Sequence, residues 1–149
     1  MGSPTEFEQL KLSNQLCFNL YAASRAVTKA YRPLLEPLGL TYPQYLVLLV
    51  LWEHGSQSVT ALGQALQLDS GTLSPLLKRL ESAGLIRRQR RPDDERAVEV
   101  GLTAAGTALR ERAASVPVAI ACKFGLSLAE GRALQAELRR LLAALDDGE

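Results

Sequence analysis

Apolar residues along the first part of the chain recur every three or four positions, which is the spacing of one face of a helix. This pattern predicts a long helix from about Glu6 to Arg32 that ends near Pro33. A second helix is expected from Thr41 to Gly55, with Pro43 in its first turn. Its residues 45–52 are apolar nearly all round, which is typical of a buried central helix. The apolar face of the first predicted helix consists of Leu16, Leu20, Ala23, Val27, Ala30 and Leu34.

Residues 58–84 have the pattern of two short helices joined by a tight turn. Ser58 is expected to cap the first, and a turn at residues 68–71 leads into the second, which presents four leucines inward. Either Asp69 or Thr72 can cap this second helix. Pro75 favours Thr72, because with Asp69 as cap the proline would remove an interior hydrogen bond.

Two short strands, 85–90 and 97–102, are expected on either side of a charged tip at 91–96, which together form a wing. A helix then runs from 103 to about Cys122 with an irregularity at Pro117. Ser127 and Glu130 form a capping box for a last helix that ends near Leu145. The predicted fold is mainly α with a small β-wing, a winged helix-turn-helix.

Composition favours one mostly helical domain over residues 1–149. The chain has 47% apolar residues, seven prolines and eleven glycines, with few β-branched runs. No targeting or membrane-spanning segment is evident, so we expect a cytoplasmic protein with no membrane partner, whose two cysteines stay reduced. The first and last helices, 6–34 and 103–145, carry more apolar surface than a small domain covers, which predicts a homodimer.

Positive charge is concentrated although the net charge is only +1. Six cations lie within residues 78–91, against the single acid Glu81. A solvated surface would explain the charge cluster by itself. DNA binding explains the charge cluster, the helix-turn-helix and the wing together, so residues 41–102 are expected to bind double-stranded DNA. Arg96 at the wing tip can enter a minor groove. The other candidate DNA contacts are Ser70, Thr72, Ser74, Lys78, Arg79, Arg90 and Arg91.

Three segments resemble the MarR family of winged-helix regulators: LQLDSGTLSPLLKRLE at 66–81, GLI at 84–86 and DDER at 93–96. The resemblance covers essentially the whole chain. It implies a homodimer joined through its N- and C-terminal helices, which binds a pseudo-palindromic operator and represses a nearby gene. It also implies that Asp94 braces Arg96 in the wing.

Within that family, LCFNLY at 16–21, Tyr31 and TYPQY at 41–45 are similar to the organic hydroperoxide resistance regulators. This resemblance implies that Cys17 is the peroxide sensor and that Tyr31 and Tyr42 of the partner subunit hydrogen-bond its sulfur. Tyr21 is a weaker candidate for the same pocket, one helical turn after Cys17. Phe18 adds apolar surface that suits an organic hydroperoxide as inducer better than hydrogen peroxide.

Cys122 defines the expected subtype. A sulfenic acid condenses with a second thiol to a disulfide, and the resemblance implies that Cys122 resolves oxidised Cys17 across the subunit boundary. The strain of closing this bond can rotate the winged domains away from the operator. Each cysteine has a simpler interpretation as a small packed side chain.

Two other functions remain open. A regulator released by a small aromatic ligand would use Tyr21, Tyr31, Tyr42 and Trp52 as its pocket. A thiol peroxidase would need a cationic site beside Cys17, where helical spacing offers only Arg25 and Lys29. No metal site and no cofactor are expected, since His54 is the only histidine and neither cysteine has a ligand at metal spacing.

Overall fold

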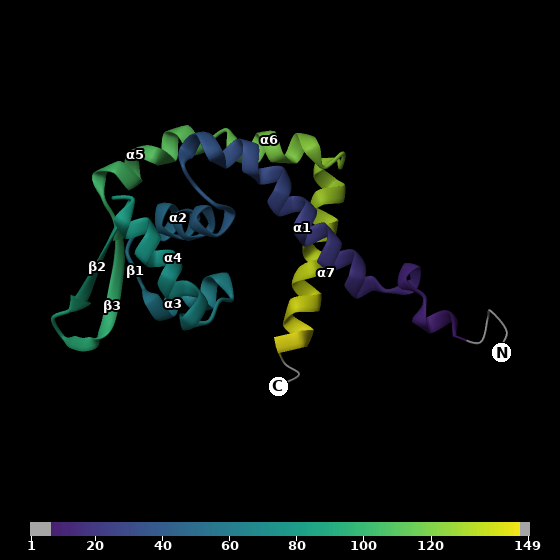
Figure 1. Ribbon diagram of the computed structural model, residues 1–149, viewed down its shortest axis with the longest axis horizontal. Coiled ribbons are helices and arrows are strands. Elements are labelled where there is room, and N and C mark those ends of the chain that lie inside the picture. The colour runs from purple at the N-terminus through teal and green to yellow at the C-terminus, as the bar shows by residue number, and fades with distance from the viewer. Residues whose placement is uncertain (1–6, 147–149) are drawn as a thin grey trace. The chain divides into compact units, whose positions relative to one another are not determined.

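The computed structural model describes residues 7–146, apart from the side chains of Glu95 and Arg96. The chain forms two compact units, one that ends at Ala114 and one that begins at Ser115. Helices dominate both units, and one small antiparallel sheet lies in the first (Figure 1). The expected fold class, mainly α with a small β-wing, is confirmed.

The N-terminal helix starts later than expected. Residues 8–14 form two short 3-10 turns, Glu8–Leu10 (η1) and Leu12–Asn14 (η2), and α1 covers Leu16–Leu35. Two side-chain amides bond to backbone carbonyls here, Asn14 Nδ2 to Glu8 O at 2.8 Å and Gln15 Nε2 to Gln9 O at 2.7 Å. Side-chain donors of this kind compete with helical hydrogen bonds, so the prediction of a helix from Glu6 was wrong for this stretch.

The end of α1 also differs from the prediction, because Pro33 lies inside the helix and does not end it. Proline removes one backbone donor from the helix. The helix nevertheless continues to Leu35, whose side chain is buried in the core and gains apolar burial there. A 3-10 turn, Glu36–Leu38 (η3), and Gly39 in the left-handed conformation then lead into the second helix.

Helix α2, Tyr42–His54, is the buried central helix that its apolar sequence predicts. Thr41 and Gln44 form a capping box at its start, and Gly55 ends it with a φ of 77°. The core around it draws on helices and the wing, and its fully buried members include Leu48, Leu51, Leu62, Leu73, Leu77, Leu80, Ile86 and Val100.

The helix-turn-helix consists of α3, Val59–Leu66, and α4, Ser70–Ser82. Ser58 caps α3 as expected, and Asp69 caps α4 by accepting a hydrogen bond from the Thr72 amide at 3.1 Å. Pro75 therefore lies inside α4, and it has no N–H to give to the carbonyl of Gly71. That residue is exposed, so water can solvate the free carbonyl.

The wing is the hairpin of β2, Ile86–Arg91, and β3, Asp94–Leu102, with an irregularity between Arg90 and Arg91. A third strand that the sequence pattern did not predict, β1 at Gln57–Ser58, pairs with β3, so the strand order is β1-β3-β2. Only two residues long, β1 is too short to show a periodic pattern.

Helix α5, Ala104–Ala113, completes the first unit, and Gly106 in its first turn joins three elements. The indole nitrogen of Trp52 in α2 donates to the Gly106 carbonyl at 2.9 Å. A Cβ at position 106 would lie 2.1 Å from the Leu85 carbonyl oxygen at the base of the wing. Only glycine allows this close approach.

The second unit contains α6, Val116–Lys123, and α7, Leu128–Asp146. The predicted irregularity near Pro117 is the break between α5 and α6, after which proline occupies the first turn of α6. The capping box of Ser127 and Glu130 is confirmed by both of its hydrogen bonds. No described residue of α7 is buried; of its leucine stripe, Leu134, Leu142 and Leu145 are exposed, and Leu138 and Leu141 are half-buried.

Replacing Gly106 with alanine is expected to destabilise the protein by about 1–3 kcal/mol, because the added methyl group must displace the Leu85 carbonyl. Urea unfolding of both proteins at equal concentration measures this difference. Gly71→Ala is the matched control, since the nearest atom to its Cβ is 3.7 Å away. An unchanged unfolding midpoint for Gly106→Ala would contradict the close packing described here.

Candidate nucleic-acid interface and thiol site

Helix α4 separates its leucines from its polar side chains. Leu73, Leu76, Leu77 and Leu80 are buried. Helical periodicity therefore turns the other positions outward, and all five candidate DNA contacts of this helix are exposed: Ser70, Thr72, Ser74, Lys78 and Arg79.

Thr72 has a second role, because its amide and hydroxyl groups hydrogen-bond to the Asp69 cap. These bonds hold the pKa of the Asp69 carboxyl below its usual value, with the side-chain bond the larger cause. The start of α4 is thus fixed by an ionised cap at the place where a recognition helix meets DNA.

The wing cations divide into two groups. Arg88 pairs with Glu81 at 3.1 Å and Arg91 pairs with Glu99 at 2.8 Å. No ion pair with a described side chain involves Lys78, Arg79, Arg87 or Arg90. The sequence pattern identified the cluster but not this division, which requires the register of the β2–β3 hairpin.

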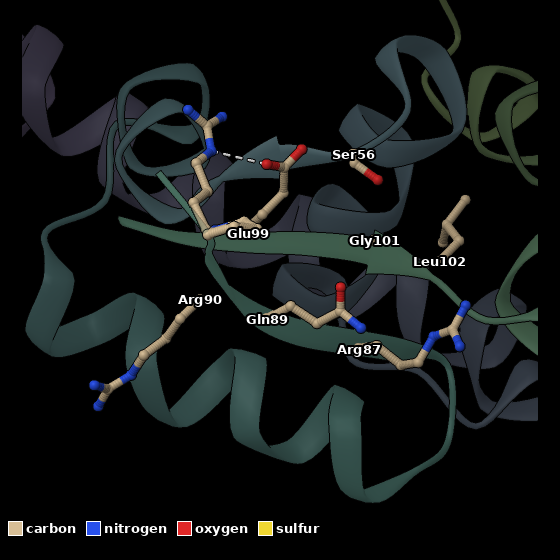
Figure 2. Close-up of a pocket in the computed structure, with 9 residues that line it drawn as sticks. Ser56, Arg87, Gln89, Arg90, Glu99, Gly101 and Leu102 are labelled. Atoms are coloured by element: carbon tan, nitrogen blue, oxygen red, sulfur yellow. Dashed lines mark hydrogen bonds and ion pairs between the residues drawn. The ribbon is translucent and has the colours of Figure 1, made fainter. Parts of the chain in front are cut away.

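A groove of about 280 Å³ runs along this part of the sheet, lined by residues that include Ser56, Arg87, Gln89 and Glu99. Figure 2 shows Glu99 joined by its ion pair, whereas the side chain of Arg90 points away from it. Arg90 is therefore an exposed wing cation that is directed away from Glu99.

The predicted brace between Asp94 and Arg96 stays a prediction. Both residues belong to β3, and Asp94 is the register partner of Arg91 at the wing tip. The side chain of Arg96 lies outside the described residues.

Cys17 is the second residue of α1 and is exposed. It precedes a groove of about 650 Å³ along α1, lined by Phe18, Tyr21, Arg25 and other residues of this helix. Phe18 is 43% exposed and Tyr21 is 61% exposed, and the Arg25 guanidinium lies 5.6 Å from the centre of the Tyr21 ring. Cys17 thus stands beside an open surface of aromatic and cationic side chains.

Tyr31 and Tyr42 lie in contact, with ring centres 4.6 Å apart. Tyr45, which was not among the predicted sensor residues, completes a tyrosine cluster, with its ring 5.7 Å from Tyr31 and 6.4 Å from Tyr42. Tyr31 and Tyr42 also line a cavity of about 450 Å³ between α1 and α2. The spacing of Tyr42 and Tyr45 on one helix face is the signal that could have identified the cluster.

Burial raises the pKa of Tyr31 to about 12, and the neighbouring Tyr42 and Tyr45 add to this effect. Burial also raises the pKa of Tyr42 and of Tyr45. All three phenols stay protonated near neutral pH, so they can donate hydrogen bonds to an anion.

The sequence-predicted sensor residues fall into two places. Cys17, Phe18 and Tyr21 lie near the start of α1, whereas Tyr31 lies fourteen residues after Cys17 on the same helix, about 21 Å along its axis. Tyr31 and Tyr42 therefore cannot reach Cys17 within one chain. Cys122 is exposed near the end of α6, in the second unit.

Within residues 7–146, no group of three or more histidine, cysteine or acidic side chains could hold a metal ion. No single helix of this part of the chain is long and apolar enough to cross a membrane, and only two bent pairs of consecutive helices pass the same test together.

The family model of the MarR family matches residues 40–98, the segment that contains the helix-turn-helix and most of the wing. The organic hydroperoxide resistance transcriptional regulator of Bacillus subtilis is 51% identical over 140 residues, covering 94% of this chain and 90% of that protein. The chain belongs to the MarR family. MarR-family members are DNA-binding regulators, not enzymes, and this chain is a transcriptional regulator of the MarR type.

Solved structures agree with this assignment. Reduced AbfR bound to DNA is 40% identical and has a TM-score of 0.76, covering 93% of this chain and 96% of that one. A disulfide form of AbfR is 39% identical with a TM-score of 0.63, covering 94% and 95%; AbfR is a protein of Staphylococcus epidermidis. MarR-family regulators bind DNA as dimers.

Lys78→Ala is expected to weaken DNA binding several-fold on every duplex and to lower the salt dependence by about one released counterion. The reason is that Lys78 is an exposed cation on α4 without an ion pair among the described residues. Fluorescence anisotropy across a salt series measures both quantities. Arg140→Ala in α7 removes the same charge and serves as the control; equal effects of both variants would exclude a specific role for Lys78.

The pH dependence of stability should report the buried phenol of Tyr31. Its folded-state pKa is raised from 10.0 to about 12, so the neutral phenol stabilises the fold below about pH 10 and this contribution is lost as the pH approaches 12. The unfolding midpoint of wild type should therefore fall relative to that of Tyr31→Phe over this interval. A constant difference between the two proteins would contradict the raised pKa.

Proposed function

We propose that this chain is a transcriptional repressor that senses organic hydroperoxides by oxidation of Cys17. The observation that carries this proposal is the exposed free thiol of Cys17 at the start of α1, beside the open aromatic surface of Phe18 and Tyr21. The aromatic rings of Phe18 and Tyr21 can accept the alkyl part of an organic hydroperoxide. The likeness to the Bacillus subtilis organic hydroperoxide regulator supports the same function.

The first chemical step is attack of the Cys17 thiolate on the distal oxygen of the hydroperoxide. An S–O bond forms as the O–O bond breaks, and the alkoxide takes up a proton and leaves as the alcohol. The sulfur is oxidised to a sulfenic acid and the peroxide is reduced. Tyr31 and Tyr42 of the partner subunit are proposed as hydrogen-bond donors to this sulfur, which their raised pKa values allow near neutral pH.

The second step is attack of the Cys122 thiolate of the partner subunit on the Cys17 sulfenic acid. An S–S bond forms, and the sulfenic oxygen leaves as water after it is protonated. The exposure of Cys122 and the disulfide form of AbfR support this step. We propose that the dimer joins through residues 6–34 and 103–145, where exposed apolar side chains include Leu16, Val118, Phe124 and Leu134.

Release of DNA follows from geometry. A disulfide requires Cα atoms within about 7 Å of each other. Forming it between two subunits moves the helices that carry the winged units, so the two copies of α4 no longer match the half-sites of a pseudo-palindromic operator. The proposed contacts to that operator are the α4 donors, Arg90, Arg91 and Arg96, with Asp94 bracing Arg96.

A second candidate is release by a small aromatic ligand. The cavity of about 450 Å³ beside Tyr31 and Tyr42 supports it. The four aromatic residues expected to form this pocket do not share it, because Tyr21 lines the other groove and Trp52 packs its ring edge-on to Tyr45. A ligand of this type would release DNA without any change at the cysteines.

Three proteins test the redox function: wild type, Cys17→Ser and Cys122→Ser. Each is titrated with cumene hydroperoxide and analysed by non-reducing gel and by gel shift on a duplex that the reduced protein selects from a random pool. Wild type should form a covalent dimer as it releases DNA, and dithiothreitol should reverse both changes. Cys17→Ser should keep its DNA, while Cys122→Ser should be oxidised at Cys17 without forming the covalent dimer.

Each variant can contradict one part of the proposal. Release of DNA by peroxide from Cys17→Ser would exclude Cys17 as the sensor, and a covalent dimer of Cys122→Ser would exclude Cys122 as the resolving thiol. If wild type keeps its DNA under peroxide and releases it with an aromatic acid, the second candidate replaces the first.

A further inference from the structure

A short connection joins recognition helix α4 to the wing. Three residues, 83–85, separate Ser82 at the end of α4 from Ile86 at the start of β2. Gly84 among them has a φ of 77°, in the region where only glycine turns without strain. A rotation at this glycine would change the angle between the helix and the hairpin.

Part of the space between the two elements is open. A groove of about 420 Å³ lies between α4, the hairpin and residues 58–60, and its lining includes Ser74 and Leu77 of α4 and Arg88, Arg91, Ala97 and Val98 of the hairpin. Leu77, Leu80 and Ile86 are buried in the core at the base of the wing. Contacts at the edge of the groove add to this packing in holding the angle.

Glu81, in the last turn of α4, makes two such contacts with one residue of the wing. Its Oε2 accepts a hydrogen bond from the Arg88 backbone N–H at 3.1 Å, and its Oε1 accepts one from Arg88 Nη2, also at 3.1 Å. The side chains of Arg88 and Glu81 are 30% and 39% exposed, respectively. Among the side chains that the structure describes, no other ion pair joins α4 to the sheet.

We propose that Glu81 is a positioning residue for DNA binding, which locks the wing to the recognition helix through Arg88. Glu81 binds both the backbone N–H and the guanidinium group of Arg88. The first bond fixes the position of strand β2, and the second fixes the direction of the Arg88 side chain. α4 and the wing contact different grooves of the same half-site. Holding their angle before binding removes an ordering cost that DNA binding would otherwise have to meet. The inference rests on DNA binding by this chain, and it is independent of the cysteine chemistry.

The charge of Glu81 makes this role separable from electrostatics. A carboxylate among Lys78, Arg79, Arg87 and Arg90 repels phosphates, so its removal should tighten DNA binding if charge alone matters. A positioning role predicts the opposite sign. Arg88 offers a second comparison, because Arg87 beside it carries the same charge, is exposed and has no ion pair among the described residues.

The experiment uses the reduced full-length protein and the duplex that wild type selects from a random pool. Glu81→Ala should weaken binding about tenfold, the effect expected for the loss of a charge-assisted contact. Glu81→Gln should weaken it less, since its amide oxygen can still accept from the Arg88 N–H. Both variants remove the same charge, so charge alone predicts equal, tighter binding for the two.

Arg88→Ala should weaken DNA binding more than Arg87→Ala. Hydroxyl-radical footprints of the Glu81 and Arg88 variants should lose protection where the wing contacts DNA, while the positions contacted by α4 stay protected. Hydrogen exchange at the Arg88 amide should be faster in Glu81→Ala. Glu81→Ala binding as tight as wild type or tighter, or equal effects of Arg88→Ala and Arg87→Ala, would overturn the inference. If Glu81→Ala does not fold, the comparison of Arg88→Ala with Arg87→Ala still tests the positioning role.

A wild type that binds no selected duplex would contradict DNA binding itself, and with it this inference. A wild type that binds together with unaffected Glu81 variants would contradict only the positioning role.

Discussion

Burial of the leucine face of α4 is the constraint on which the DNA-binding unit depends. Leu73, Leu76, Leu77 and Leu80 lie in the core with α2 and the base of the wing, and their removal from water is the dominant favourable term in the folding of such a unit. Because this face is buried, the helical period places the polar positions of α4 on the opposite, exposed face. The same burial fixes the C-terminal end of α4, where Glu81 meets Arg88.

The proposed sensor function depends on a second constraint, the stiffness of α1. A continuous helix keeps Cys17 and Tyr31 about 21 Å apart along its axis. The tyrosine cluster and the thiol therefore belong to different places in one chain, and the proposed site is complete only if two copies supply them. The proposed disulfide between the subunits would therefore change the geometry of the dimer, because it joins the elements that are proposed to hold the dimer together.

Most helices were predictable because their signals are local. Thr41, Ser58 and Ser127 cap helices through side-chain bonds to amides three residues away, and the leucine spacing of α4 shows its buried face directly. Predictions of helix ends failed where a distant contact or a competing side-chain hydrogen bond determined where the helix begins or ends. Asn14 and Gln15 keep residues 8–14 out of the helix, and burial of Leu35 carries α1 past Pro33.

The sequence by itself determined the helix-turn-helix, the wing, the two cysteines and the cationic cluster, because period, caps and residue type are properties of short segments. Only the tertiary structure decided which cations are held by Glu81 and Glu99 and which stay exposed, since a pair such as Arg91 and Glu99 depends on strand register. It also decided that Tyr45 joins Tyr31 and Tyr42, and that Gly106 touches the wing base, because packing brings together residues that lie far apart in the chain.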